Sequence, residues 1–536
     1  MSPFAGKSKR SLRISLKHSV EAVAVLCIVG GAAPDVLAQD NLRDPANYAW
    51  QAGAIRHAQQ MRIFFDPDSG QQPTPPIIPA FEIDFDPSGL LATAQPGGPT
   101  QTSQNAFFAN LGSNGRTCFT CHQPANGWGV SAASVQGRFY ASYGNDPIFR
   151  LVDGAVCPNA DVSSIAAKRQ AYSLLLKKGL IRIGLQVPST IAGTSTPTEY
   201  RIVSVTDPYG CNTNPLTGLT TIGLVAPTAG TVSIYRRPLP STNLGFLSAI
   251  MWDGREPTLA QQSVDATVIH AQGASPGAPQ QQQIVNFESG IFTAQLYDNK
   301  AKYLNSAGAT GGPETLTKLL SGFFIGINDP VPSGPPPSFG NPKGLPFTSK
   351  IFDLYEAWAG IGGSGEVDEF RRSVARGEDL FNNTPINIAG VAGLNDTLNA
   401  PSIPGFCGTC HDTPDVGNHS NKLPINIGIA NGGPNNNNPG LDIGDLPTFT
   451  LQCVSGSLTG KTYVVTDPGR ALISGKCADI GKLKGPILRG LAGRAPYFHN
   501  GSAATLLDVV SFYNLRFNIG LTDAQMNDLA AFLQTL

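Results

Sequence analysis

Residues 118–122, Cys-Phe-Thr-Cys-His, and residues 407–411, Cys-Gly-Thr-Cys-His, repeat one C-x-x-C-H pattern. This spacing is typical of the covalent attachment of a c-type haem. The two thiols add across the two vinyl groups of one porphyrin, and the histidine that follows points its imidazole at the iron. The sequence therefore predicts two covalently bound haem c groups, each held by two thiols and one imidazole. The residues concerned are Cys118, Cys121 and His122, and Cys407, Cys410 and His411.

Two other interpretations of the C-x-x-C spacing fit the chain less well. A thioredoxin-like redox motif would need a βαβ setting and no obligatory histidine, whereas both copies here carry the histidine. A structural zinc site would pair the two C-x-x-C units, but these lie far apart in the sequence.

Composition narrows the class of protein further. Hydrophobic residues make up 41 % of the 536 positions, which is enough to bury a core and argues against wholesale disorder. The 60 glycines and 43 prolines predict many turns and long ordered loops. Charged residues are only 14 %, the net charge is −1 and no long run of Lys or Arg occurs, so we expect no nucleic-acid partner.

Residues 1–38 resemble a secretory signal peptide. They combine a basic start with an apolar stretch at Ala22–Ala33 and small residues before Gln39. The alternative, a transmembrane anchor, fits less well because the stretch is short and is bounded by Glu21 and Pro34. We therefore expect a periplasmic or secreted protein without a membrane anchor.

Four cysteines lie outside the haem motifs and the signal segment: Cys157, Cys211, Cys453 and Cys477. In an exported protein, an even remainder of cysteines favours disulfides over a reactive thiol. Three connectivities are possible. The simplest is local pairing, Cys157 with Cys211 and Cys453 with Cys477, because each pair falls within one segment between motifs.

Two helices are predicted for the C-terminal third of the chain. Apolar or small residues before the second haem motif share one helix face, and a second apolar stripe follows a capping box formed by Thr522 and Gln525. The first face consists of Phe370, Val374, Gly377 and Phe381, and the second of Leu529, Phe532, Leu533 and Leu536. Two helices that cross beside a haem are the cytochrome c arrangement, so residues 366–536 are interpreted as one such domain.

The rest of the chain is divided by composition. Residues 39–104 form a Pro-rich N-terminal extension, and residues 105–345 are interpreted as an N-terminal cytochrome c-like domain. Segments rich in β-branched residues predict a small β insertion at about 180–238 within that domain. Residues 346–365 are assigned to a linker. The expected fold class is mainly α, with two cytochrome c-like domains.

Two further segments carry a family resemblance. Trp252-Asp-Gly-Arg255, followed by Thr258-Leu259, and the octapeptide 495–502, Ala-Pro-Tyr-Phe-His-Asn-Gly-Ser, resemble the bacterial diheme cytochrome c peroxidase family. They also resemble its relative that oxidises a precursor of methylamine dehydrogenase. With the two haem motifs, these segments form four landmarks in the order of the family, across about residues 105–536.

The resemblance implies different roles for the two haem groups. The haem on His122 would be the reaction site, and the haem on His411 would relay or store electrons. Trp252 would lie between them as a bridge. The alternative is that Trp252 is a buried core aromatic.

The chain departs from the family at the distal position of the first haem. Where the family has a glutamate, twenty positions after the bridging tryptophan, this chain has Gln272, which is not an acid. His270 lies two positions earlier and is a candidate for a base or a sixth ligand, because splitting O–O requires a titratable group near the iron. The alternative for His270 is an ordinary hydrogen-bonded histidine.

The chain also departs from the family at its calcium site. The resemblance would place calcium ligands where this chain has Arg237 and Arg494. Guanidinium groups cannot ligate calcium and would repel it, so calcium is not expected.

Tyr513 is the residue that the resemblance places as sixth ligand of the second haem. It lies seventeen positions after Pro496, and no gap is needed between them. A phenolate ligand would stabilise ferric and higher iron, whereas a methionine thioether favours ferrous iron. The alternative is a core tyrosine with a hydrogen-bonded hydroxyl.

The resulting expectation is a periplasmic diheme oxidoreductase of the peroxidase type. Peroxide or O2 would react at the His122 haem, with electrons passing through Trp252 and the His411 haem from a small redox protein or an organic donor. Two alternatives remain at this point: a diheme oxidase or oxygenase that acts on an organic or protein substrate, and a diheme electron carrier without chemistry of its own.

Overall fold

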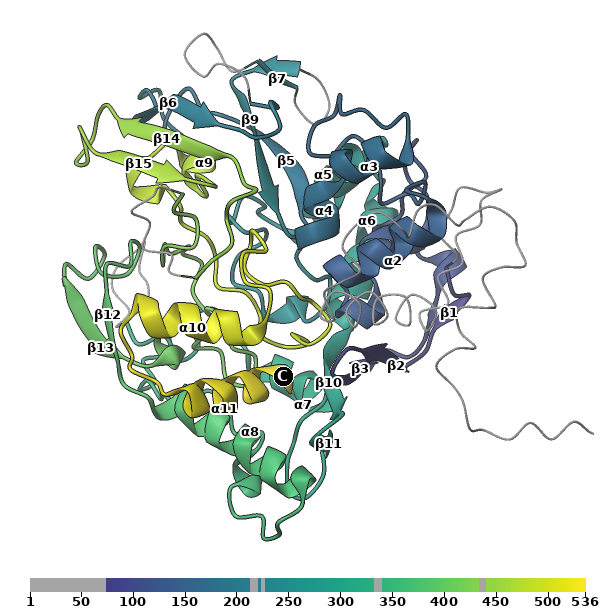
Figure 1. Ribbon diagram of the computed structural model, residues 1–536, viewed down its shortest axis with the longest axis vertical. Helices are drawn as coiled ribbons and strands as arrows, with labels where there is room; N and C mark the ends of the chain where they lie inside the picture. Colours follow the sequence, from purple (N-terminus) through teal and green to yellow (C-terminus); the bar gives the residue numbers. More distant parts are fainter. Residues whose placement is uncertain (1–73, 213–219, 223–226, 332–339, 433–439) are drawn as a thin grey trace, which may run out of the picture. The chain divides into compact units, whose positions relative to one another are not determined.

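The computed structural model describes residues 74–212, 220–222, 227–331, 340–432 and 440–536 (Figure 1). The predicted signal peptide, residues 1–38, and the greater part of the predicted extension, residues 39–104, lie outside these ranges. Within the described ranges, no helix combines the length and the apolar character needed to cross a bilayer.

The expectation of a mainly α fold is wrong. Of the described residues, 29 % lie in helices and 18 % in strands, so the fold mixes both types with long loops. One reason lies before the first haem motif, where the chain forms only short 3-10 turns, η1 (Thr102–Gln104) and η2 (Ala106–Phe108), in place of a long helix. The many glycines and prolines interrupt helices and favour such turns.

The two helices predicted for the C-terminal part are present, together with a third. α8 (Glu366–Asn383) packs against α11 (Asp523–Gln534), which lies beside α10 (Leu506–Arg516) (Figure 1). At the crossing, a Cβ on Gly377 would come within 2.1 Å of the Asp528 carbonyl oxygen, so only glycine permits this close approach. The Thr522–Gln525 capping box is present at the start of α11, as predicted. The predicted apolar faces are buried or half-buried at this contact.

The other helices are short. They are α2 (Ala132–Ser142), α3 (Ile165–Ala171), α4 (Ser173–Lys178), α5 (Leu259–Asp265), α6 (Ala278–Gly290), α7 (Glu314–Leu319) and α9 (Ala471–Ser474). α5 continues directly into a single π-helical turn, Ala266–His270.

The strands form several small antiparallel sheets. Four of the sheets have two strands each: β1 (Ile77–Ile78) with β4 (Thr100–Gln101), β5 (Ile181–Gln186) with β9 (Thr231–Arg236), β7 (Thr220–Ile222) with β8 (Pro227–Ala229), and β12 (Ile386–Ala389) with β13 (Ser402–Gly405). The predicted β-branched segments between 180 and 238 thus form strands.

Two sheets join segments that are remote in sequence. The four-stranded sheet has the order β11 (Lys302–Tyr303), β10 (Phe292–Asp298), β3 (Gly89–Ala94), β2 (Phe81–Asp86). The three-stranded sheet has the order β15 (Thr462–Val465), β14 (Thr448–Cys453), β6 (Tyr200–Thr206) (Figure 1). The second sheet therefore takes strands from both predicted cytochrome domains. The predicted domain limits, 105–345, 346–365 and 366–536, stay a prediction.

The four remaining cysteines pair locally. Cys157 is bonded to Cys211, and Cys453 is bonded to Cys477, which confirms the simplest of the three predicted connectivities. The second bridge joins the end of β14 to the turn that follows α9, and so ties the three-stranded sheet to the segment after β15.

Candidate functional site

The two C-x-x-C-H motifs adopt the same local structure. Each begins with a 3-10 turn, Cys118–Thr120 in the first and Cys407–Thr409 in the second. The backbone N–H of the histidine donates to the carbonyl of the first cysteine, at 3.1 Å in the first motif and 3.0 Å in the second. In both motifs the threonine hydroxyl accepts a hydrogen bond from the backbone N–H three residues earlier. The described residues place the other cysteines in the two disulfides, and these four thiols are free.

Both motif histidines are oriented by the same hydrogen bond. Nδ1 of His122 lies 2.9 Å from the carbonyl oxygen of Trp128, and Nδ1 of His411 lies 2.6 Å from that of Gly417, six residues on in each case. A carbonyl oxygen can only accept, so Nδ1 carries the proton and Nε2 is left to coordinate a metal. Burial lowers the pKa of His122 to about 4 and also lowers the pKa of His411, which keeps both imidazoles neutral at pH 7.

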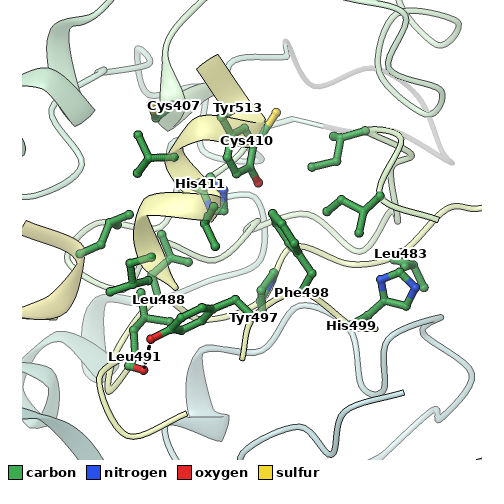
Figure 2. Close-up of a pocket in the computed structure, with 18 of the residues that line it drawn as sticks. Cys407, Cys410, His411, Leu483, Leu488, Leu491, Tyr497, Phe498, His499 and Tyr513 are labelled. Carbon is green, nitrogen blue, oxygen red and sulfur yellow. Dashed lines mark hydrogen bonds between the residues drawn. The ribbon is translucent and has the colours of Figure 1, made fainter. Parts of the chain in front are cut away.

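Each motif lines its own cavity. The cavity at the second motif is mainly apolar and is walled by α8, α10, α11 and the segment 481–499 (Figure 2). The cavity at the first motif is walled by residues around 236–271, including the turn that ends α5. An apolar pocket with few, placed polar groups is typical of cofactor sites.

Tyr513 lies in the cavity of the second motif, with Cys410 and His411 (Figure 2). It comes from α10, its ring stacks on Phe517, and its centroid is 6.5 Å from that of the His411 ring. Among the described residues, its hydroxyl has no hydrogen-bond partner. Burial raises the pKa of Tyr513 well above its ordinary value, so a phenolate here would require a nearby cation such as a metal.

His270 lies in the wall of the other cavity, with Cys118, Cys121 and His122. The π-helical turn at 266–270 positions it, and its Nδ1 lies 2.6 Å from Oδ2 of Asp153. Asp153 also accepts from Arg116 at 2.5 Å. Burial alone would raise the pKa of Asp153, but the charge of Arg116 and the bond from His270 outweigh it and hold this pKa below its ordinary value.

Gln272 is placed outside the residues that line this cavity. Its side-chain oxygen accepts from Asn114 at 3.3 Å, its carbonyl accepts from Ser113 at 3.0 Å, and its φ is +55°. The structure therefore brings His270, and not Gln272, to the first haem motif.

Trp252 lines both cavities. Its Nε1 donates to the carbonyl of Arg237 at 2.8 Å, and its own carbonyl accepts from the backbone N–H of Lys484 at 2.8 Å. Its ring makes an edge contact with His499, with centroids 6.1 Å apart. Its position in the shared wall is what a bridge between the two motifs would require.

The turn that carries Trp252 is fixed by buried charges. Asp253 is fully buried and accepts from Arg236 at 2.6 Å and from Arg255 at 3.1 Å. Arg236 in turn donates to Asp467 at 2.6 Å. Removing one partner of such a buried network leaves an uncompensated charge, so the network holds the turn in one geometry.

Three cations, of which Arg237 and Lys484 are buried and Arg494 is half-buried, stand at the wall between the cavities. Arg237 and Lys484 line both cavities, and Arg494 lines the one at His411. Within the described residues, their partners are carbonyl oxygens and none is a carboxylate; Lys484, for example, donates to Ala249 at 3.0 Å. Burial lowers the pKa of Lys484 to about 7, of Arg237 to about 9 and of Arg494 to about 10.

These features fit the haem group that the motifs predict. A porphyrin brings propionate carboxylates, which are the counter-ions that buried cations without acidic partners require. His499, 1 % exposed, supplies two further ring nitrogens that have no hydrogen-bond partner in the described structure and that lie in the wall of the His411 cavity (Figure 2). With the thiols and Nε2 atoms, each cavity has the groups needed to attach and ligate one haem.

Arg237 and Arg494 also stand where the family resemblance would place calcium ligands. A guanidinium nitrogen of Arg237 donates to the carbonyl oxygen of Arg494 at 2.5 Å. The Arg237 guanidinium also donates to the carbonyls of Lys178 and Val130, and the Arg494 guanidinium donates to the carbonyl of Gly490. The expectation that calcium is not held here stays a prediction.

No pattern in the sequence marks several of the polar residues that line the site. Asp153, Ser241, Glu288 and Lys484 are single polar residues in loops or on a short helix, and their partners are remote in sequence. Burial raises the pKa of Glu288 to about 7. Only the fold reveals that these residues line the cavities.

Comparisons with known proteins agree with the motifs. No protein-family model matches the chain. The chain is 31 % identical over 142 residues to the cytochrome c peroxidase IdrP2 of Denitromonas iodatirespirans, which covers 25 % of this chain and 36 % of that protein. It is 41 % identical over 69 residues to the cytochrome c peroxidase IdrP1 of the same organism, which covers 11 % of this chain and 18 % of that protein.

A further match is to IdrP2 of Pseudomonas sp. (strain SCT), at 31 % identity over 140 residues, 24 % of this chain and 35 % of the relative. A solved structure of a MauG-like protein associated with microbial copper homeostasis is 16 % identical and covers 59 % of this chain and 78 % of its own, with a TM-score of 0.26. The chain thus spans about a third or less of the length of these curated relatives. The resemblance to cytochrome c peroxidases that the motifs predict is confirmed.

The first prediction concerns haem content. Replacing Cys407 and Cys410 by alanine should lower the covalent haem per chain from two to one, because each pair of thiols attaches one porphyrin. The same change at Cys118 and Cys121 should have the same effect. The haem-to-protein ratio of the denatured, purified protein measures this. The double variant Cys453→Ser with Cys477→Ser is the control and should keep both haem groups; a parent protein with one covalent haem or none would contradict the assignment.

Proposed function

We propose that this protein is a diheme c-type oxidoreductase of the peroxidase type. Peroxide is reduced at the site of His122, and electrons arrive from the site of His411 by way of Trp252. The observation that carries the proposal is the position of Trp252 in the wall of both cavities. The similarity to cytochrome c peroxidases supports the reaction class.

The chain would hold one haem on each motif. Cys118 and Cys121 attach the first and Nε2 of His122 ligates its iron, while the corresponding residues of the second motif hold the other. When bound, the haem groups supply an iron that binds peroxide and a store of electrons. The residues around them determine where protons and electrons move.

His270 is the proposed proton carrier. The carboxylate of Asp153 can only accept, so Nδ1 of His270 donates to it and Nε2 keeps a free lone pair. Nε2 can therefore take a proton from one peroxide oxygen and return it to the oxygen that leaves. The buried Arg116 keeps Asp153 ionised and so fixes this tautomer.

Trp252 is the proposed electron path. Its indole fills the wall that the cavities share, and two hydrogen bonds and the buried charges of its turn hold it there. Electrons would enter at the His411 site from a small redox protein or an organic donor. The signal segment supports a periplasmic or secreted location.

One observation favours a second candidate function. The hydroxyl of Tyr513 faces the His411 cavity without a hydrogen-bond partner in the described structure, as a ligand of the iron would. A phenolate ligand stabilises oxidised iron and suits the storage of oxidising equivalents. With that ligand, the protein would be a diheme oxidase of an organic or protein substrate.

The Trp252→Phe variant tests the electron path. The reduced variant, mixed with peroxide in a single turnover, should show slower transfer between the two haem groups than the parent, because the indole and its bond to Arg237 are lost. Trp358→Phe is the matched control: Trp358 is fully buried and donates to the Ser306 carbonyl, but it lines neither cavity. Equal kinetics in Trp252→Phe and the parent would refute the bridge.

The His270→Gln variant tests the proton carrier. Peroxide turnover should fall by about 10²–10⁴-fold, the usual contribution of a general acid–base group, while the covalent haem content stays unchanged. Gln261→Ala, on the exposed side of the same helix, should keep the parent rate. If His270→Gln retains full turnover, another group moves the proton.

The Tyr513→Phe variant tests the second candidate. If the phenolate is a ligand, the ferric spectrum of one haem changes and its reduction potential rises, because a donor that favours ferric iron is lost. Met526→Leu is the control, since Met526 packs in the α8–α11 core outside the cavity. A spectrum and potential that change in Met526→Leu and stay unchanged in Tyr513→Phe would reverse the ligand assignment.

A further inference from the structure

The two motif histidines differ in the hydrogen-bond partners of Nδ1. Nδ1 of His122 contacts a second oxygen besides the Trp128 carbonyl: Oγ of Ser241 lies 3.0 Å from it. Ser241 Oγ in turn donates to Oε1 of Glu288 at 2.9 Å. A chain of hydrogen bonds therefore runs from the imidazole to a carboxyl group.

The direction of this chain follows from its donors and acceptors. The Trp128 carbonyl can only accept, so the single ring proton sits on Nδ1 and is shared between that carbonyl and Ser241 Oγ. The hydroxyl proton of Ser241 is then free to bond Glu288. Each link passes negative charge toward the ring, as a carboxylate partner does for a metal-bound histidine.

Burial and hydrogen bonds hold Glu288 and Ser241 in place. Glu288, on α6, is 4 % exposed, and its second oxygen has no hydrogen-bond partner in the described structure. Ser241 is 5 % exposed, and its backbone N–H donates to the same Trp128 carbonyl at 2.8 Å. Burying a carboxyl group with one neutral partner costs free energy, so packing alone would not favour this arrangement.

His411 lacks such a chain. Among the described residues, its Nδ1 bonds only the Gly417 carbonyl. The nearest acid in sequence, Asp412, accepts from the backbone N–H and the hydroxyl of Ser420, at 2.6 and 2.9 Å, and lies 3.7 Å from His419. The two motifs have the same backbone geometry, but within the described ranges His122 is linked to a carboxyl group through a hydroxyl and His411 is not.

We propose that Ser241 and Glu288 are positioning residues that act through His122 and stabilise the oxidised state of the iron it ligates. Their hydrogen-bond chain makes Nε2 a stronger donor than a carbonyl partner alone would. This inference rests on the proposed function, because it concerns the site at which peroxide reacts. It distinguishes the two haem groups by residues outside both motifs.

The test uses Ser241→Ala, which breaks the chain, and Glu288→Gln, which keeps the shape and removes the charge. Both are compared with the parent at one alkaline pH, by the iron–histidine stretching band of the ferrous protein and by spectroelectrochemical titration. The stretching band should move to lower frequency. At a fixed potential, the ferric-to-ferrous ratio of the His122 haem should fall by about ten-fold, in the range of other outer-shell substitutions.

Two controls isolate the effect. Thr242→Val alters the neighbouring buried hydroxyl, which bonds Thr293 and the Ile291 carbonyl and does not contact His122, and it should leave band and ratio unchanged. The haem on His411 should also be unchanged in every variant. If Ser241→Ala does not fold, the nearly isosteric Glu288→Gln still decides the question.

The outcomes separate this inference from the proposed function. If the parent shows the stretching band, and both variants have the same band and the same ferric-to-ferrous ratio as the parent, the inference is overturned and the proposed function stands. A parent without the band has no open ferrous iron, which contradicts the proposed function; the ferric-to-ferrous ratio of the variants then decides the inference by itself.

Discussion

The hydrogen bond from Nε1 of Trp252 to the carbonyl of Arg237 holds an indole ring in the wall between the two cavities. The backbone on either side of this bond is fixed in turn. The N–H of Arg237 donates to the carbonyl of His499 at 2.7 Å, and the neighbouring Arg236 is bound by Asp253 and Asp467. Segments around residues 237, 252, 484 and 499, which are remote in sequence, therefore meet at one place. The cavities of the two haem motifs share this wall.

The two haem motifs on either side of that wall have the same local structure, but the residues around them differ. Both C-x-x-C-H turns orient their histidines by a carbonyl six residues on. The first cavity adds a titratable histidine with a buried acid, whereas the second adds a tyrosine without a hydrogen-bond partner among the described residues. The first cavity thus offers a histidine held by a buried acid, and the second a tyrosine beside the motif histidine.

Features that depend on a short stretch of sequence could be predicted, whereas contacts between segments far apart in the sequence could not. The faces of α8 and α11 and the capping box at Thr522 follow from spacing and were predicted, and the disulfides match the simplest of the three connectivities that the sequence left open. The mainly α expectation failed because the pairing of β3 with β10 and of β6 with β14 depends on chain segments far apart, for which no local pattern exists. The same limit applies to the site: the position of His270 depends on the π-helical turn, and Asp153 and Glu288 are single acids whose partners only the fold brings near.

The central claim, that one wall couples two haem sites, is tested most directly by titrating the fully reduced parent protein with peroxide under anaerobic conditions. Each peroxide takes up two electrons when it is reduced to water, and each haem supplies one in passing from ferrous to ferric. We expect one equivalent of peroxide per chain to oxidise both haem groups together, as followed at their separate absorption bands. If one equivalent takes both electrons from a single haem and the other haem stays ferrous, the two sites are not coupled and the proposed electron path is contradicted.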